Sequence, residues 1–311
     1  MRQCSGNREA VVSNIPEVPK RLRIAVGIAT LGRNAILEQT LTRLKSQSRQ
    51  ADAIVVCAPN VADLQSARDC YPGVVELIGP RGLARQRNAI IKAVHDYDVL
   101  TFFDDDFVPS ETYLAAVEAV MLGHPNVVMA TGRLIGDGII GPGLTFAEAD
   151  QMLREHQVRP SSSGSIADVY NGYGCNMSIR LAPVRADALT FDERLPMYGW
   201  LEDVDFSRRL APHGRIVEID ASGIHLGLKQ GRQSGIKLGY SQVANPLYLM
   251  SKGTMSGRRA LMLLGRNLLA NTIRCLRAEP WVDRRGRLKG NLRAIGDLVS
   301  GRLDPVRIET L

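Results

Sequence analysis

The sequence lacks any long hydrophobic run, and this absence argues against a membrane-spanning helix. No stretch approaches the roughly 20 uninterrupted apolar residues that a helix needs to cross a bilayer. The first residues also lack the apolar segment that is typical of a secretory signal peptide. We therefore expect a protein of the cytoplasm.

Cysteines and aromatic residues are also scarce. The five cysteines are scattered, show no C-x-x-C spacing and are odd in number. This pattern favours a reducing compartment over a disulfide framework or a cysteine-ligated zinc site. Aromatic residues make up 5% of the chain, and no known nucleic-acid-binding module is present. A nucleic-acid-binding protein is therefore the weakest of the interpretations.

One phosphate-binding signature is incomplete. The spacing from Gly27 to Gly32 is similar to that of a P-loop. The Lys and the Ser or Thr that must follow the second glycine are missing, so the sequence does not indicate an NTPase of that class.

Positive charge is concentrated in one part of the chain. The net charge is +7, and residues 227–311 carry 16 Lys and Arg against 5 Asp and Glu, whereas the rest carries 23 against 27. Such a segment would be attracted to an anionic surface, for example lipid headgroups or a phosphorylated acceptor. The alternative is a basic helical face that is simply solvated.

The first part of the chain alternates between short apolar runs and amphipathic segments. Its composition, 45% hydrophobic and 23% charged, is that of an ordinary globular protein. The alternation predicts an α/β fold with a mostly parallel central sheet and helices on both faces. The predicted strands are 22–30, 53–57, 74–78 and 98–103, and the helices between them are 35–47, 62–70 and 83–95.

At 311 residues the chain exceeds the usual length of one domain. We expect a loose arm over residues 1–20, an α/β domain over 21–226 and a basic helical extension over 227–311. The α/β domain should continue with strands at 126–131 and 215–219, helices at 146–157 and 201–210, a flexible Ser/Gly stretch at 161–165 and a polar turn and strand over 171–179.

Three consecutive acids, Asp104, Asp105 and Asp106, directly follow the predicted strand 98–103. Ligands of open parallel sheets bind at the carboxyl ends of strands. Neighbouring carboxylates need a cation or strong hydrogen bonds to stay ionised together, and Mg²⁺ and Mn²⁺ prefer such oxygen ligands. In an extended segment Asp104 and Asp106 lie on one side and Asp105 on the other, which favours Asp104 and Asp106 as the metal ligands. A solvated acidic turn is the alternative.

A second acidic cluster opens the predicted helix 201–210. Glu202 and Asp203 stand in its first turn, directly after Trp200 and Leu201. Free backbone N–H groups at a helix start should lower the pKa of a carboxyl there. A carboxylate held in this way can accept a proton from an attacking hydroxyl, and the flat ring of Trp200 suits a sugar. Simple helix capping is the alternative.

Four motifs together give residues 22–225 a resemblance to family 2 glycosyltransferases of the GT-A fold. Residues 29–34 (ATLGRN) stand where that family has a Pro-Thr-Tyr-Asn-Arg turn. Residues 81–88 (RGLARQRN) are similar to its Gly-x-x-x-x-Arg-Asn helix start. Residues 103–109 (FDDDFVP) are similar to its metal-binding aspartate motif, and Glu202-Asp203 to its catalytic Glu-Asp pair.

This resemblance implies an inverting, metal-dependent glycosyltransferase that uses a nucleotide-diphosphate donor, expected to be a UDP-sugar. The acceptor would be a saccharide or a polyprenyl-diphosphate-linked saccharide of polysaccharide biosynthesis. Asp203 would be the general base with Glu202 beside it, and Mn²⁺ or Mg²⁺ would be held by Asp104, Asp106 and His225, although a purely structural His225 is the alternative. The implied donor contacts are Thr30, Arg33, Arg87, Asp104, Asp105 and Trp200.

Some positions depart from the family pattern. The second strand ends in Cys57 and Ala58, where the family often has an aspartate that reads uracil, and Asp63 is the nearest substitute. Leu31 replaces an aromatic residue that can stack on the base. The Gln-x-x-Arg-Trp signature of processive synthases is absent, which implies that one sugar is added per acceptor.

Two further questions stay open at the level of sequence. A sugar nucleotidyltransferase of related fold also uses aspartates and a metal, but the first turn supplies only Gly27, Gly32 and Arg33 of the Gly-rich basic loop that it would need. Residues 258–277 form an apolar stripe edged by arginines. This stripe predicts either peripheral attachment to the inner membrane or packing on the α/β domain.

Overall fold

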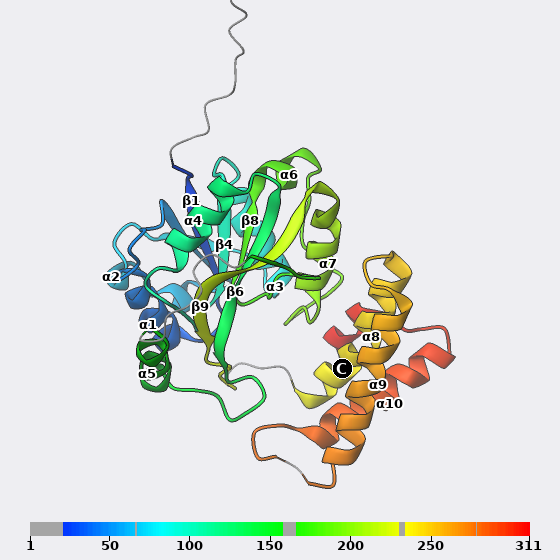
Figure 1. The fold of residues 1–311 in the computed structure, drawn as a ribbon. Coiled ribbons are helices and arrows are strands. Elements are labelled where there is room, and N and C mark those ends of the chain that lie inside the picture. Colours follow the sequence, from blue (N-terminus) through cyan, green and yellow to red (C-terminus); the bar gives the residue numbers. More distant parts are fainter. Residues whose placement is uncertain (1–20, 66, 158–165, 230–233, 278) are drawn as a thin grey trace, which may run out of the picture.

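The computed structural model describes residues 21–65, 67–157, 166–229, 234–277 and 279–311. The predicted arm 1–20 and the predicted flexible stretch 161–165 lie outside the described residues. The described residues form a sheet domain with helices on both faces and a group of three long helices beside it (Figure 1).

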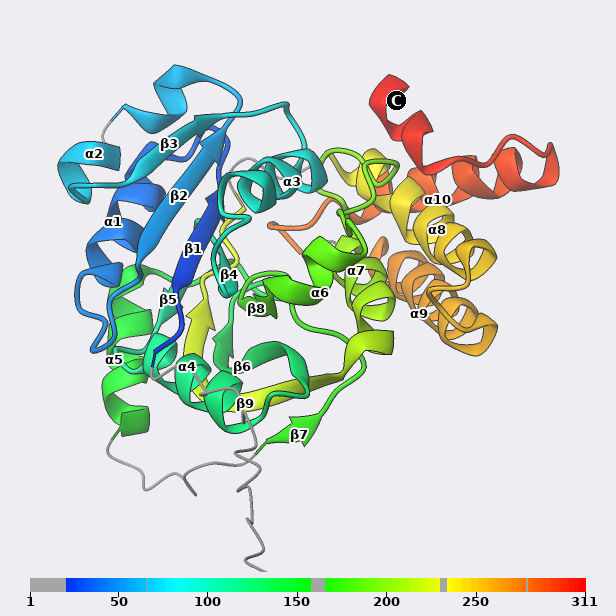
Figure 2. The same cartoon turned by 90° about the horizontal axis from the view of Figure 1, so that it is seen from above.

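Nine strands of the described residues make one sheet. Strands β1, β2, β3, β4, β6 and β9 run in one direction, and β5, β7 and β8 run in the other. The order is β3 (Val75–Ile78), β2 (Ala53–Ala58), β1 (Ile24–Ala29), β4 (Val99–Asp104), β8 (Met177–Arg180), β6 (Val127–Asp137), β9 (Arg215–His225) and β5 (Phe107–Pro109), and β7 (Ala167–Asp168) pairs with β9 (Figure 2).

Alternating side chains of the central strands enter two separate cores. In β1, Ile24 and Val26 belong to one core, and Ala25 belongs to the other. The first core is covered by α1 (Asn34–Leu44), α2 (Ala67–Cys70) and α4 (Tyr113–Gly123), and the second by α3 (Leu83–Ala93), α6 (Leu181–Ala186) and α7 (Glu202–Leu210). A smaller cluster packs α5 (Phe146–Gln157) against β5 and β9. Burial of both sheet faces explains why the strands are continuous apolar runs.

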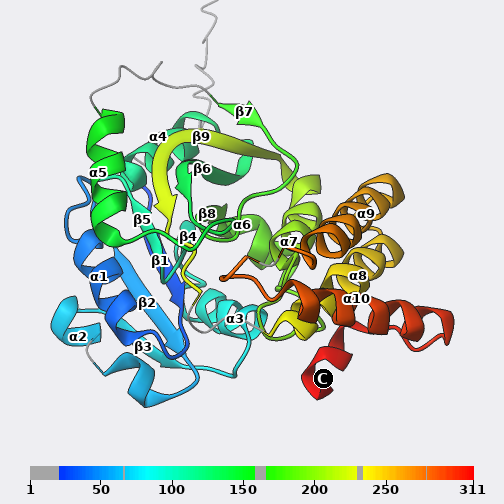
Figure 3. The same ribbon diagram turned by 90° about the horizontal axis from the view of Figure 1, so that it is seen from below.

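The remaining helices form a bundle of their own and pack on α7 (Figure 3). They are α8 (Gly235–Lys252), α9 (Gly257–Arg274) and α10 (Arg284–Val299), followed by a 3-10 segment, Pro305–Thr310. An apolar cluster that includes Val204 of α7 and Leu249 of α8 joins the bundle to the sheet domain. Asp205 of α7 is fully buried and pairs with Lys252 at 2.9 Å. No helix in the described part of the chain is both long and apolar enough to cross a membrane.

The predicted fold class is confirmed, and several elements differ in detail. The predicted helix 62–70 is wrong as a single helix, because a 3-10 turn, Val61–Leu64, precedes the short α2. Strands β6 and β9 extend well beyond the predicted 126–131 and 215–219. The elements that were not predicted are β5, β7, α4 and α6. The domain limits at residues 21–226 and 227–311 stay a prediction.

Helices α8 and α10 approach each other through glycines, which gives a test of the bundle. A Cβ on Gly239 would lie 2.0 Å from the carbonyl oxygen of Arg287. Since a backbone oxygen cannot rotate away, we expect Gly239→Ala to lower the free energy of unfolding by about 1–3 kcal/mol. Urea unfolding followed by circular dichroism measures this change.

Gly265 in α9 is the matched control, because a Cβ there would meet nothing within 4 Å. Gly265→Ala should be neutral or stabilise the protein by up to about 1 kcal/mol, since alanine favours a helix over glycine. Equal urea midpoints for the two variants would contradict the close approach of α8 and α10.

Candidate active site

Strand pairing brings the predicted acids next to the predicted histidine. Asp104 is the last residue of β4, and Asp106 directly precedes β5. Strand β5 pairs antiparallel with the end of β9, so that Phe107 faces His225 across the ladder. Nε2 of His225 therefore lies 3.5 Å from Oδ1 of Asp106, although the two residues are far apart in sequence.

Asp104, Asp106 and His225 form a group that fits a divalent metal ion. One ligand atom from each lies within 4.8 Å of the others. Two carboxylates and one imidazole are ligands that Mn²⁺ accepts readily, and Mg²⁺ also takes the carboxylates. Burial lowers the pKa of His225, but hydrogen bonds to Asp106 and Asp137 outweigh this effect and raise it to about 10. The surroundings of the imidazole are thus strongly negative, and this field would also attract a cation.

The second ring nitrogen of His225 has a carboxylate partner. Nδ1 lies 3.0 Å from Oδ1 of Asp137, and the hydroxyl of Tyr173 donates to Oδ2 of the same carboxylate at 3.1 Å. Metal-bound histidines usually have such a partner, which fixes the orientation of the ring. Sequence reasoning missed both Asp137 and Tyr173, because no local motif marks them.

Asp105 points away from this group, as predicted, although residues 105 and 106 form a turn between β4 and β5 and are not extended. Its carboxylate accepts hydrogen bonds from Oγ1 of Thr30 at 2.7 Å and from Nη1 of Arg33 at 2.8 Å. Burial raises the pKa of Asp105 to about 6, and the charge of Arg33 opposes this rise. Three residues predicted to touch the donor therefore contact one another, and their role in donor binding stays a prediction.

A buried arginine joins the two acidic clusters. Arg87 of α3 is 2% exposed and donates to Glu202 at 2.5 Å and to Asp104 at 3.1 Å. It also donates to the carbonyl oxygen of Gly174 at 2.8 Å. This guanidinium places the start of α7 directly beside the end of β4.

Asp203 has a different environment from Glu202. Its carboxylate accepts hydrogen bonds from the N–H of Gly174 at 3.1 Å and from the N–H of Val204 at 2.7 Å. The expectation of a lowered pKa is wrong, because burial raises the pKa of Asp203 above its ordinary value despite these two donors. Desolvation of the carboxylate outweighs the field of the helix start.

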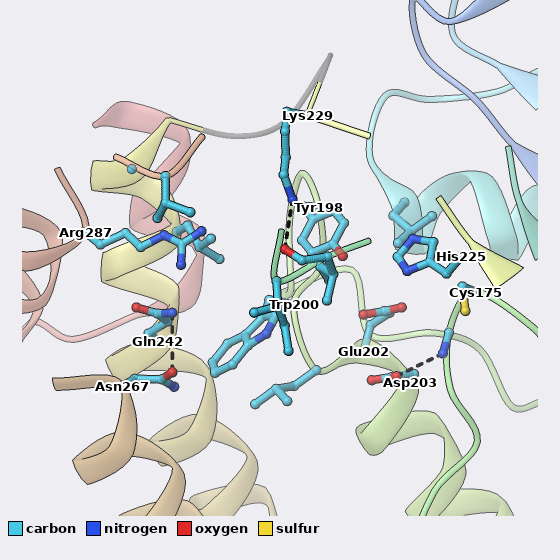
Figure 4. Close-up of a pocket in the computed structure, with 18 of the residues that line it drawn as sticks. Cys175, Tyr198, Trp200, Glu202, Asp203, His225, Lys229, Gln242, Asn267 and Arg287 are labelled. Carbon is cyan, nitrogen blue, oxygen red and sulfur yellow. Dashed lines mark hydrogen bonds between the residues drawn. The ribbon is translucent and has the colours of Figure 1, made fainter. Parts of the chain in front are cut away.

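A cavity of about 860 Å³ separates the acidic clusters from the helical bundle. Figure 4 shows Glu202, Asp203 and His225 on one side, Gln242, Asn267 and Arg287 on the other, and Trp200 between them. This volume is within the range of ligand sites for small molecules. The indole of Trp200 and the acids of α7 thus face the same space.

The predicted site residues fall into two groups. Arg87, Asp104, Trp200, Glu202, Asp203 and His225 line the cavity. Among the described residues, the cavity wall does not include Thr30, Arg33, Asp105 or Asp106. The last of these still lies beside His225.

Comparison with known proteins identifies the fold. No protein-family model matches the chain, and no curated protein does. Residues 1–349 of S. aureus TarS, solved in complex with UDP-GlcNAc, share 13% identity over 93% of this chain and 91% of that one, with a TM-score of 0.53. The mannosyltransferase PcManGT from Pyrobaculum calidifontis, in complex with GDP-Man and Mn²⁺, shares 15% over 95% and 85%, with a TM-score of 0.51.

A longer S. aureus TarS structure shares 16% identity over 74% of this chain, with a TM-score of 0.48. The match spans only 40% of the length of that TarS chain. The likeness to the first two structures, with TM-scores of 0.53 and 0.51, shows a shared fold. That fold is the GT-A fold of the predicted α/β class.

The carboxylate of Asp137 gives a direct test of the metal group. Asp137→Ala should weaken Mn²⁺ binding about 10–100-fold, because the imidazole of His225 loses the partner that orients it. Calorimetric titration with Mn²⁺ measures the affinity without any substrate. Asp137→Asn, which keeps an oxygen at that position, should recover part of the loss.

Asp168 of β7 offers a matched control, since it pairs with Arg215 at 2.8 Å on the exposed surface. Asp168→Ala should leave Mn²⁺ affinity unchanged. If Asp137→Ala binds Mn²⁺ as tightly as the control, His225 is not held for a metal.

Proposed function

We propose that the protein is a metal-dependent glycosyltransferase that moves a sugar from a nucleotide diphosphate to an acceptor hydroxyl. The observation that carries this proposal is the grouping of Asp104, Asp106 and His225, of which Asp104 and His225 line the same cavity as Asp203. Two proteins of the same fold support it, because their structures hold UDP-GlcNAc and GDP-Man with Mn²⁺.

Asp104, Asp106 and His225 would hold Mn²⁺ or Mg²⁺. When bound, such an ion supplies positive charge that stabilises a departing diphosphate. The orientation of His225 by Asp137 and Tyr173 supports this assignment.

Asp203 is the proposed general base. Glu202 is held by the charge of Arg87, whereas the described hydrogen bonds of Asp203 come from backbone N–H groups. Its raised pKa moves it closer to neutral pH, where a carboxylate accepts a proton from a hydroxyl more effectively. In-line attack by that hydroxyl would invert the configuration of the transferred sugar.

The finer assignment follows the motif resemblance. We propose a non-processive family 2 enzyme that uses a UDP-sugar and acts on a saccharide or a polyprenyl-diphosphate-linked saccharide in exopolysaccharide synthesis. Asp63 is the proposed contact to the base; its Oδ1 already accepts from the N–H of Gly32 at 3.0 Å. Residues 21–226 would form the catalytic domain, and residues 227–311 would bind the acceptor or the membrane.

Helix α9 has the features of a membrane-surface helix. Its sequence contains four arginines and no Asp or Glu. Large apolar side chains on it are exposed, among them Leu269 at 62% and Ile273 at 60%, and Leu276 just after it is 85% exposed. We propose that this face lies on the anionic surface of the inner membrane, with the rest of the protein in the cytoplasm.

Donor turnover tests the catalytic proposal. With Mn²⁺ and a panel of nucleotide sugars, the protein should slowly release nucleoside diphosphate, and Asp203→Asn should reduce that rate about 10²–10⁴-fold, because the base is lost. Calorimetry should show that the variant still binds donor and Mn²⁺. Asp104→Asn is the contrasting variant and should lose Mn²⁺ binding.

Two results would contradict this proposal. Full activity of Asp203→Asn would show that another group is the base. Formation of pyrophosphate from a sugar phosphate and an NTP would instead indicate a sugar nucleotidyltransferase.

Vesicle binding tests the membrane proposal. The protein should co-sediment with vesicles of anionic lipid more than with neutral ones, and Leu269→Asp should reduce this binding several-fold, because a charge would enter the apolar face. Val61 is a matched control, since it is 71% exposed on the sheet domain. Val61→Asp should bind as the unmodified protein does, and equal binding to both kinds of vesicle would exclude the proposal.

A further inference from the structure

The two walls of the cavity differ in charge. The sheet-domain wall carries the carboxylates of Asp104, Glu202 and Asp203. The bundle wall carries four arginines, which are Arg266 and Arg274 of α9 and Arg284 and Arg287 of α10. Figure 4 shows the side chain of Arg287 on the opposite side of the cavity from Glu202 and Asp203.

Two acids lie near three of these arginines. Arg274 and Arg284 share one carboxylate, because Glu279 lies 3.2 Å from the first and 2.7 Å from the second. Asp283 is the other acid of this wall, and its Oδ1 accepts from the N–H of Gly286 at 2.7 Å as the cap of α10. Among the described residues, Arg266, Arg274 and Arg284 therefore share this wall with two carboxylates.

The bundle wall also has a hydrogen-bond donor that lacks a described partner. Nδ2 of Asn267 is buried, and no hydrogen-bond partner for it exists among the described residues. Its Oδ1 accepts from Nε2 of Gln242 at 3.5 Å. An unpaired buried donor costs free energy.

We infer that the bundle wall is an anion subsite, and that its ligand is a phosphate or diphosphate group on the acceptor. Guanidinium groups match the oxygens of phosphate better than ammonium groups do, because they donate two parallel hydrogen bonds. The sugar of the acceptor would lie near Trp200, with its hydroxyl toward Asp203. The identification of this ligand as the acceptor rests on the proposed function, whereas the existence of the anion subsite does not.

The two tryptophans provide a readout that needs no activity. The sequence contains only Trp200 and Trp281, and both line this cavity. Fluorescence of the full chain in EDTA is titrated with inorganic pyrophosphate, with geranyl diphosphate and with uncharged geraniol. Both anions should give a saturable change, and geraniol should give none. Tighter binding of geranyl diphosphate indicates a lipid-linked acceptor, and equal binding indicates a soluble phosphorylated one.

Arginine variants test the wall itself. Arg266→Ala and Arg287→Ala should each weaken pyrophosphate binding about tenfold, as expected for the loss of one charge-assisted hydrogen bond. Arg293→Ala is the matched control, because Arg293 is exposed on α10 and is not among the described residues of the cavity wall. Circular dichroism verifies that the variants fold.

Two outcomes would overturn the subsite. The first is equal pyrophosphate affinity in Arg266→Ala, Arg287→Ala and Arg293→Ala. The second is binding that requires Mn²⁺ and disappears in Asp104→Asn, which would place the anion at the metal group instead.

The subsite and the proposed function can fail separately. Arginine-dependent anion binding without hydrolysis of any nucleotide sugar would refute the glycosyltransferase and leave the subsite. Hydrolysis of a nucleotide sugar with arginine-independent anion binding would refute the subsite and leave the glycosyltransferase.

Discussion

The buried charge of Arg87 is the constraint on which the arrangement of the two acidic clusters, at the end of β4 and at the start of α7, depends. A guanidinium stays ionised at any physiological pH, and a buried charge without a partner costs several kcal/mol. Arg87 can therefore be buried only where Glu202, Asp104 and the carbonyl oxygen of Gly174 surround it. Since these groups come from different parts of the chain, one side chain fixes α3, the end of β4 and the start of α7 relative to one another.

The carboxylates that follow β4 and those of α7 have separate tasks because each has different partners. Asp105 holds the turn after β1 through Thr30 and Arg33. Asp205 is fully buried and joins α7 to the bundle through Lys252 and Thr254. These two acids are satisfied within the protein. Asp203, whose described partners are backbone N–H groups, is the carboxylate proposed to exchange a proton with a ligand.

Sequence reasoning succeeds where a signal is local and fails where it is tertiary. Buried strands are continuous apolar runs and were predicted as such. The separation of Asp105 from Asp104 and Asp106 was also predicted, but a turn and not an extended segment produces it. Strand β5 is too short to show a pattern, and α4 is apolar on most sides. Asp137 lies 88 positions before His225, so only the pairing of β6 with β9 connects them. The pKa of Asp203 depends on burial, which a helix-start motif does not encode.

Helices α8, α9 and α10 supply one wall of the cavity. Nδ2 of Asn245 in α8 donates to the carbonyl oxygen of Trp200 at 2.7 Å, so the bundle helps to hold the residue between the two walls. The groups proposed to bind the metal and to accept the proton belong to the sheet domain, whereas the arginines of the cavity wall belong to α9 and α10. Changes in the bundle can therefore alter one wall of the cavity without disturbing the acids at the end of β4. Function in such a fold depends on the groups around the site, and here two separate parts of the chain supply them.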